Sequence, residues 1–133
     1  MKPLLLAAFA MFAAAPAAGP VSTPIVTTDK TWTGQPYSVP QGATQVVAQT
    51  VEMPVGGGLG VHKHPWPRFA YVQQGTLRVI NDDAHLTKDF PTGSLVVEAI
   101  GQWHHAEVVG DQPVRLLVID QVPPGQVNLV RKP

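Results

Sequence analysis

His62 and His64 are separated by a single residue, and His104 follows about forty positions later. Side chains two apart on a β-strand point to the same face, so the first two imidazoles can reach one ion together. A third imidazole from a distant strand would complete three nitrogen ligands and leave positions open for water or substrate. Imidazole suits Zn, Cu, Fe and Ni, with Mn a borderline case. The three histidines therefore predict a site for one divalent transition metal, which can be Fe, Mn, Cu, Ni or Zn.

Four glycines predict the turns around these histidines. They are Gly56, Gly75, Gly93 and Gly101. Glycine accepts the turn conformations that other residues avoid, so regularly spaced glycines indicate short strands joined by turns. Gly75, for example, separates two segments rich in apolar and β-branched residues, 68–74 and 76–81, which predicts a hairpin.

Together these residues resemble the two sequence motifs of the cupin family. The first motif is Gly-x5-His-x-His-x3,4-Glu-x6-Gly, and it is matched in register by Gly56, His62, His64 and Gly75. The second motif is Gly-x5-Pro-x-Gly-x2-His-x3-Asn, and it is matched by Gly93, Gly101 and His104. The resemblance covers roughly residues 45–120. It implies a jelly-roll barrel, also called a double-stranded β-helix, with a metal held by the three histidines.

Three positions depart from the family pattern. Arg68 stands at the Glu position of the first motif, Ala99 at the Pro position of the second and Val108 at its Asn position. The first departure matters most, because that Glu is usually the fourth metal ligand of the family. The resemblance therefore implies a three-histidine cupin, a variant that includes metal-dependent dioxygenases.

Arg68 and Glu98 are a matched pair of candidates at this site. Arg68 lies four residues after His64, and an inward arginine would place a permanent positive charge beside the ion. Glu98 stands among valines, and a carboxylate in an apolar strand usually has a partner. Glu98 either forms an ion pair with Arg68 at or beside the site, or ligates the metal in place of the missing carboxylate. The remaining interpretation is that both side chains point to solvent.

Aromatic residues and two further histidines surround the predicted ligands in the sequence. Core packing is the default interpretation of Trp66, Tyr71 and Trp103, and contact with a bound ligand is the alternative. Trp66 lies between two prolines and is a candidate for the pocket rim, whereas the Tyr71 hydroxyl could bind substrate or act as an acid. His105 is expected to point outward, because adjacent strand residues face opposite sides. His85 lies in a polar segment and is expected at the surface.

The composition indicates one small domain. The chain has 133 residues, of which 14% are charged, and nine basic residues balance nine acidic ones. A neutral chain without a polybasic stretch gives no electrostatic signal for nucleic acid or for an anionic membrane surface. The 14 prolines and 12 glycines favour many short strands over helices. A domain of this size buries a modest core, so a homodimer is expected.

The chain divides into four predicted segments. Lys2 and the apolar stretch that follows it resemble a secretory signal peptide, cut after Ala17, so export to a bacterial periplasm or secretion is expected. The predicted segments are a signal peptide (1–17), an extended arm (18–44), the barrel (45–122) and a C-terminal tail (123–133). Strands are predicted at 45–53, 59–64, 68–74, 76–81, 85–90, 94–98, 104–109 and 113–121. The apolar run at 115–119 is expected to be buried on both faces.

Three functions remain open on these grounds. The first is an exported metal-dependent oxidoreductase, dioxygenase-like, that acts on a small organic molecule with Arg68 holding an anionic group. The second is a non-catalytic cupin that binds a metal or a small ligand. The third is a structural cupin without metal, whose site is filled by an Arg68–Glu98 pair. All three have no nucleic-acid partner and no stable membrane insertion after cleavage.

Overall fold

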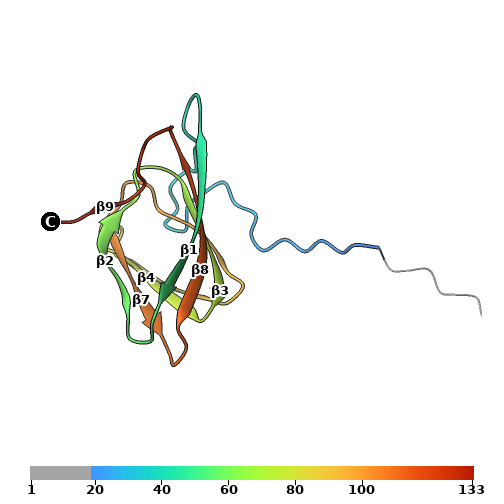
Figure 1. Cartoon of the computed structure of the whole chain (residues 1–133), viewed down its shortest axis with the longest axis vertical. Helices are drawn as coiled ribbons and strands as arrows, with labels where there is room; N and C mark the ends of the chain where they lie inside the picture. Colours follow the sequence, from blue (N-terminus) through green and yellow to red (C-terminus); the bar gives the residue numbers. More distant parts are fainter. Residues whose placement is uncertain (1–18) are drawn as a thin grey trace, which may run out of the picture.

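Nine β-strands and no helix form the part of the chain that the computed structural model describes, residues 19–133 (Figure 1). The signal peptide predicted over 1–17 lies outside the described residues. The strands are β1 (Gln45–Met53), β2 (Gly58–Lys63), β3 (Arg68–Gln74), β4 (Thr76–Asn81), β5 (Leu86–Pro91), β6 (Leu95–Val97), β7 (His104–Val109), β8 (Val114–Val122) and β9 (Val130–Arg131). No helix in residues 19–133 is long and apolar enough to cross a membrane.

The strands form two antiparallel sheets that enclose the core. One sheet has the order β1-β8-β3-β6 and the other the order β5-β4-β7-β2-β9. Neighbours within a sheet are mostly distant in sequence, because the chain crosses repeatedly from one sheet to the other. This is the double-stranded β-helix, or jelly roll. The prediction of an all-β jelly-roll barrel is confirmed.

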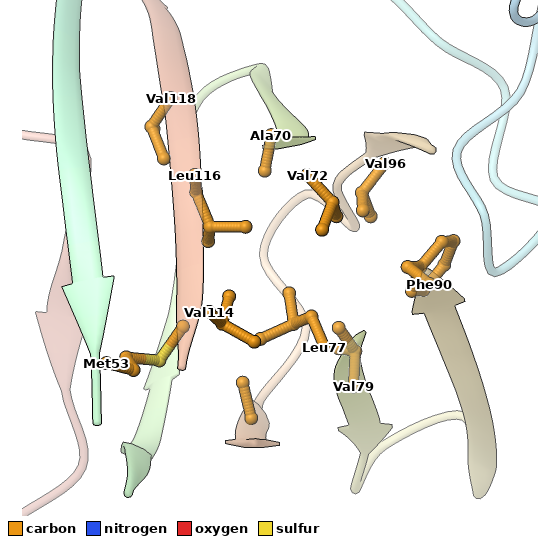
Figure 2. Packing of buried hydrophobic residues seen from close by; sticks show 11 residues of the cluster. Met53, Ala70, Val72, Leu77, Val79, Phe90, Val96, Val114, Leu116 and Val118 are labelled. Carbon is orange, nitrogen blue, oxygen red and sulfur yellow. The ribbon is translucent and has the colours of Figure 1, made fainter. Parts of the chain in front are cut away.

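Side chains from both sheets meet in one hydrophobic core (Figure 2). Its labelled members are Met53, Ala70, Val72, Leu77, Val79, Phe90, Val96, Val114, Leu116 and Val118. Along each strand these residues alternate with more exposed ones, as a half-buried sheet requires. The prediction that 115–119 is buried on both faces is wrong. Leu116 and Val118 point into the core, whereas Leu117 and Ile119 are half-buried on the outer face of β8.

A close approach between β2 and β7 aligns two of the histidines. A Cβ added at Gly58 would lie 2.2 Å from the Ala106 carbonyl oxygen, so only glycine fits at this point. The pairing register then shifts between Leu59 and His62, as at a β-bulge, and His62 comes to lie opposite His104. The backbone therefore brings together side chains that are 42 residues apart in the sequence.

The segments before and after the barrel both lie against it. In the arm, the Trp32 N–H donates to the Val97 carbonyl, and the Tyr37 ring packs on Phe69 with ring centroids 5.6 Å apart. Residues nearer the N-terminal end of the arm extend away from the barrel (Figure 1). In the tail, β9 pairs with the end of β2, where Arg131 lies opposite His62. The tail is therefore part of the five-stranded sheet and lies close to the predicted ligands.

Candidate metal centre

The three predicted histidine ligands converge inside the barrel. His62 lies on β2, His64 follows the end of β2, and His104 begins β7. The side chains are buried, with exposed fractions of 3%, 1% and 2%, and their ring centroids lie 4.4–4.9 Å apart. Their ligand nitrogens all lie within 4.8 Å of one another. Two nitrogens on one ion, each about 2.0–2.1 Å from it, can be at most about 4.2 Å apart, so a small rearrangement suffices for ligation.

Each imidazole is oriented by a backbone carbonyl on its far side. The Nδ1–H groups donate to Gly60 (2.7 Å, from His62), Asn128 (2.7 Å, from His64) and Gln102 (2.9 Å, from His104). A carbonyl oxygen can only accept, so Nδ1 carries the proton in all three rings and Nε2 carries a lone pair. A carbonyl or carboxylate behind the ring is the usual support of a metal-binding histidine. The three rings are therefore preset as neutral nitrogen donors.

Burial keeps these imidazoles neutral. Loss of solvent lowers the pKa of His62 to about 4. The pKa of His64 falls to about 2, because of burial first and of the nearby Arg68 charge second. The pKa of His104 is also lowered, again mainly by burial. Only a neutral imidazole can bind a metal, so the ligating form is present at neutral pH.

The Glu98 carboxylate lies beside the histidines, and its Oε2 atom has no hydrogen-bond partner among the described residues. Its side chain is buried directly after β6, and its Oε2 atom lies 3.9 Å from His104 Nε2. Both atoms belong to the few buried side-chain polar atoms that have no partner among the described residues. Burial raises the pKa of Glu98 to about 7, although the Arg68 charge acts in the opposite direction. Buried polar atoms are nearly always paired, so two unpaired atoms that face each other are suited to hold a cation between them.

Arg68 is paired with Asp120 and not with Glu98. Its Nε and Nη2 atoms donate to the two oxygens of the Asp120 carboxylate, at 2.7 and 2.8 Å. The predicted Arg68–Glu98 ion pair is therefore wrong, and so is the interpretation that both side chains point to solvent. The physical reason is the strand register, which places Arg68 directly opposite Asp120 in the pairing of β3 with β8. There, two N–H groups of the planar guanidinium can donate to the two oxygens of one carboxylate.

Glu98 is nonetheless the neighbour of Arg68 in the sheet. The Glu98 N–H donates to the Arg68 carbonyl at 3.0 Å, which continues the pairing of β3 with β6. A buried carboxylate is thus present next to Arg68, directly after β6 and not at the Glu position of the first motif. Of the three interpretations of Glu98, only the metal ligand is compatible with this geometry.

Asp120 and Asn128 belong to the site but were missed in the sequence. The Asn128 amide donates to Asp120 Oδ1 at 2.6 Å and accepts from the Trp66 N–H at 2.8 Å. A signal for Asp120 exists, because it continues the inward alternation of Leu116 and Val118 and a buried carboxylate needs a partner. Asn128 has no such signal, because it lies in a loop whose course the sequence does not define.

A small cavity of about 30 Å³ lies among these groups. Its lining consists of His62, His64, His104, Arg68 and Glu98 together with the aliphatic residues Val51, Leu59, Ala70, Leu77, Val79, Ala106, Leu116 and Val118. A single water needs roughly 10–15 Å³ on this measure, so the space suits an ion and one or two small ligand atoms.

None of the three candidate aromatic residues lines this cavity. Tyr71 lies on the outer face of β3, because it alternates with the inward Arg68 and Ala70. Trp103 packs under the Lys63 ammonium, which lies 4.5 Å from the ring centroid. Trp66 is half-buried, and the contact it makes with the site network is through its backbone N–H.

The two other histidines lie away from the centre, as expected. His105 is on the opposite side of β7 from His104, with its Nδ1 3.3 Å from the Asp82 carboxylate. His85 is exposed in the turn between β4 and β5. Neither belongs to the cluster of ligand atoms formed by the three buried histidines.

Comparison with known proteins agrees with this architecture. The cupin domain model matches residues 49–120. A solved structure from Bacillus halodurans is 22% identical over 65% of this chain and 69% of its own, with a TM-score of 0.55. The polyketide cyclase RemF from Streptomyces resistomycificus is 24% identical over 69% of this chain and 65% of its own, with a TM-score of 0.56.

An oxalate decarboxylase from Lactobacillus farciminis is 27% identical over 65% of this chain, with a TM-score of 0.56. This chain spans only 26% of that longer protein. No curated protein matches the sequence. At these identities the structures share the fold with this chain, and its chemistry has to be argued from its own residues.

Proposed function

The chain belongs to the cupin family, and we propose that it is a metal-binding cupin in which Glu98 supplies the fourth ligand. His62, His64 and His104 hold one divalent transition ion, which is Fe, Mn, Cu, Ni or Zn. The observation that carries this proposal is the pair of unpaired buried atoms, Glu98 Oε2 and His104 Nε2, 3.9 Å apart. An ion between the histidines and the carboxylate would satisfy both atoms.

The charges of the buried groups support the same assignment. The three imidazoles are neutral, and Arg68 and Asp120 cancel each other as an ion pair. An ionised Glu98 is then the one uncompensated charge among the polar groups that line the cavity. An unpaired buried carboxylate is costly, and a dication beside it would remove that cost.

We further propose that the centre acts on a small organic molecule, in the manner of a metal-dependent dioxygenase. When bound, Fe, Mn, Cu or Ni would supply Lewis-acid and redox chemistry, whereas Zn would supply Lewis-acid chemistry alone. Asp120 takes two donor groups of the Arg68 guanidinium, which leaves the second terminal nitrogen for an anionic group of the ligand. The aliphatic lining keeps bulk water away from the ion and strengthens the electrostatic contacts of a bound ligand.

We also propose that the protein is exported from the cytoplasm. The charged and apolar pattern of the first 17 residues supports export, so the mature protein would acquire its metal in the periplasm or outside the cell. Mass measurement of the protein recovered from a periplasmic fraction tests this, and a chain that retains Met1 in the cytoplasm would contradict it.

Elemental analysis of the purified protein tests the metal site first. We expect close to one ion per chain in the wild type and none in the double variant His62→Ala/His104→Ala. The matched control is His85→Ala/His105→Ala, which removes two histidines that lie outside the centre and should retain the ion.

The second measurement separates the catalytic function from simple binding. The metal-loaded protein is given small organic acids while oxygen uptake is followed. Uptake that disappears in the histidine double variant would support the oxidoreductase. A bound ion without turnover would favour a non-catalytic binding cupin. Absence of metal after reconstitution with each of the five ions would contradict the proposal and leave a structural cupin.

A further inference from the structure

We propose that Asn128 is a positioning residue of the metal centre, through which the C-terminal tail (residues 123–133) is coupled to metal binding. This inference rests on the metal site proposed above. The tail lies beyond the matched cupin domain, which ends at residue 120. Part of the metal centre would therefore be supplied by a segment that the family motifs do not contain.

The three histidines differ in where their backbone acceptors come from. His62 and His104 donate to carbonyls only two residues away in the chain, at Gly60 and Gln102. His64 donates to the Asn128 carbonyl, 64 residues away in the sequence. The orientation and tautomer of His64 therefore depend on the tail, whereas those of the other two rings depend on local backbone.

The Asn128 side chain fixes the position of that carbonyl. Its Oδ1 accepts from the Trp66 N–H at 2.8 Å, and its Nδ2 donates to Asp120 Oδ1 at 2.6 Å and to the Pro67 carbonyl at 3.3 Å. The residue is 5% exposed, so water does not replace these bonds. A buried amide with all three bonds made holds one orientation, and the backbone carbonyl is held with it.

The same amide connects the tail to the charged side of the site. Asp120 Oδ1 accepts from both Asn128 Nδ2 and Arg68 Nε, so one oxygen joins the tail to the buried ion pair. The backbone adds a further attachment, because β9 pairs with β2 beside His62 and the Lys132 N–H donates to Val61. The tail thus contacts both the histidine side and the carboxylate side of the cavity.

Coupling of this kind is reciprocal. If a docked tail raises the affinity for metal by some factor, bound metal must favour the docked tail by the same factor. The Trp66 amide reports on docking, because its N–H donates to Asn128 Oδ1. Metal should therefore slow hydrogen exchange at Trp66 in the wild type, although this amide is not a metal ligand.

The experiment compares two amide-to-alanine variants of the full chain. Asn128→Ala removes the buried amide, and Gln126→Ala removes an exposed amide of the same loop. Metal affinity is measured by competition with a chelator, using Zn²⁺ or Co²⁺ as the probe ion. We expect Asn128→Ala to weaken binding about 10–100-fold, the usual effect of residues that support a metal ligand. Gln126→Ala should match the wild type.

A nitrogen NMR spectrum of the histidine side chains, recorded on the metal-free proteins, adds a readout that does not need the metal. In the wild type and in Gln126→Ala, His64 should be a single Nδ1–H tautomer. In Asn128→Ala it should become a mixture of tautomers, while His62 and His104 keep theirs. A merely structural role would affect all three rings or none.

Each outcome bears on the proposal. Affinity within twofold of the wild type, or an unchanged His64 tautomer in a folded Asn128→Ala variant, would overturn it. If that variant fails to fold, metal-independent exchange at Trp66 in the wild type would overturn it instead. If the wild type binds no ion, the proposed function fails, and the tautomer of His64 still decides whether Asn128 positions this ring.

Discussion

Two buried carboxylates, Asp120 and Glu98, flank Arg68 in the four-stranded sheet, and they differ in their hydrogen bonding. Their exposed fractions are similar, 4% and 7%. Asp120, on β8, accepts two hydrogen bonds from Arg68 and one from Asn128. Glu98, after β6, has an oxygen without any partner and faces the histidines. Equal burial therefore does not imply an equal role.

The difference between the two sides indicates which carboxylate has its hydrogen bonds satisfied by the fold and which could still accept a ligand. Both oxygens of Asp120 already accept hydrogen bonds from the protein, and a ligand could only compete with these bonds. The Asp120 carboxylate therefore stabilises the fold. A carboxylate that is buried and unpaired lowers the stability of the folded chain until something binds it. The Glu98 side is therefore the side that a ligand can complete.

The largest effect on stability is expected at Asp120. Asp120→Asn keeps the shape of the side chain but leaves the Arg68 charge without compensation, and loss of one partner of a buried ion pair costs about 3–5 kcal/mol. Chemical denaturation of the metal-free protein at neutral pH measures this cost. A loss of unfolding free energy below about 1 kcal/mol would mean that the Arg68–Asp120 pair contributes no more than a surface ion pair. The proposed difference between Asp120 and Glu98 would then be wrong.

Glu98→Gln should lower the affinity for metal without lowering the stability of the fold. The change removes an unpaired buried carboxylate, so the metal-free variant should be at least as stable as the wild type near neutral pH. Its metal affinity should fall by more than the roughly 10–100-fold seen when a supporting residue is lost. Chelator competition measures this, with the exposed Glu107→Gln as control. Unchanged affinity would show that Glu98 is not a ligand.

Glu98 should also have a smaller effect, on how the stability of the metal-free protein depends on pH. Burial raises the pKa of Glu98 from 4.5 to about 7. Between these values the folded chain keeps a proton that the unfolded chain has lost, so stability from this group falls as pH rises. We expect the wild type to lose stability relative to Glu98→Gln from about pH 4.5 to about pH 7, and the difference to level off above that.

Denaturation of both proteins across this pH range measures the difference. Burial lowers the pKa of His62 and His64, which adds stability as pH rises, but this contribution is common to both chains and cancels. A difference that stayed constant with pH would indicate that Glu98 is ionised throughout.

The smallest effect is expected at a second arginine–aspartate pair. Arg78 and Asp89 join β4 to β5 with the same two-bond geometry as Arg68 and Asp120, at 2.7 and 2.9 Å, but at the surface. Exposed pairs contribute little, because water and salt screen them. Arg78→Met should leave the denaturation midpoint almost unchanged, whereas Arg68→Met should lower it clearly. Equal shifts would mean that burial does not distinguish the two pairs.

The strands could be predicted because alternation and glycine turns are local features of the sequence. The three histidines could be predicted because their spacing relative to the glycines is fixed. Alternation along β3 and β8 and the glycines between strands define where the strands begin and end, to within a residue or two of the structure. The spacing of His62, His64 and His104 relative to these glycines defines one end of the barrel. None of these inferences required knowledge of which strands pair.

The partner of Arg68 could not be predicted in the same way, because it depends on strand order. Glu98 and Asp120 flank Arg68 on its two neighbouring strands, and the sequence alone drew attention to Glu98. Alternation did contain an unused signal for Tyr71, which is one residue out of phase with the inward Ala70. Asn128 depends on the path of a loop that closes over the barrel, and such paths follow from tertiary packing.

The small size of the cavity limits how much of any molecule could reach the histidines. About 30 Å³ beneath the histidines, walled by aliphatic side chains, admits a few atoms and no more. A groove of about 220 Å³ lies on the other side of Arg68, between β1 and the C-terminal tail, and Arg68 lines both spaces. A molecule too large for the cavity could rest in this groove and still contact the Arg68 side chain. Recognition of such a molecule would then depend on the residues of β1 and of the C-terminal tail that line the groove.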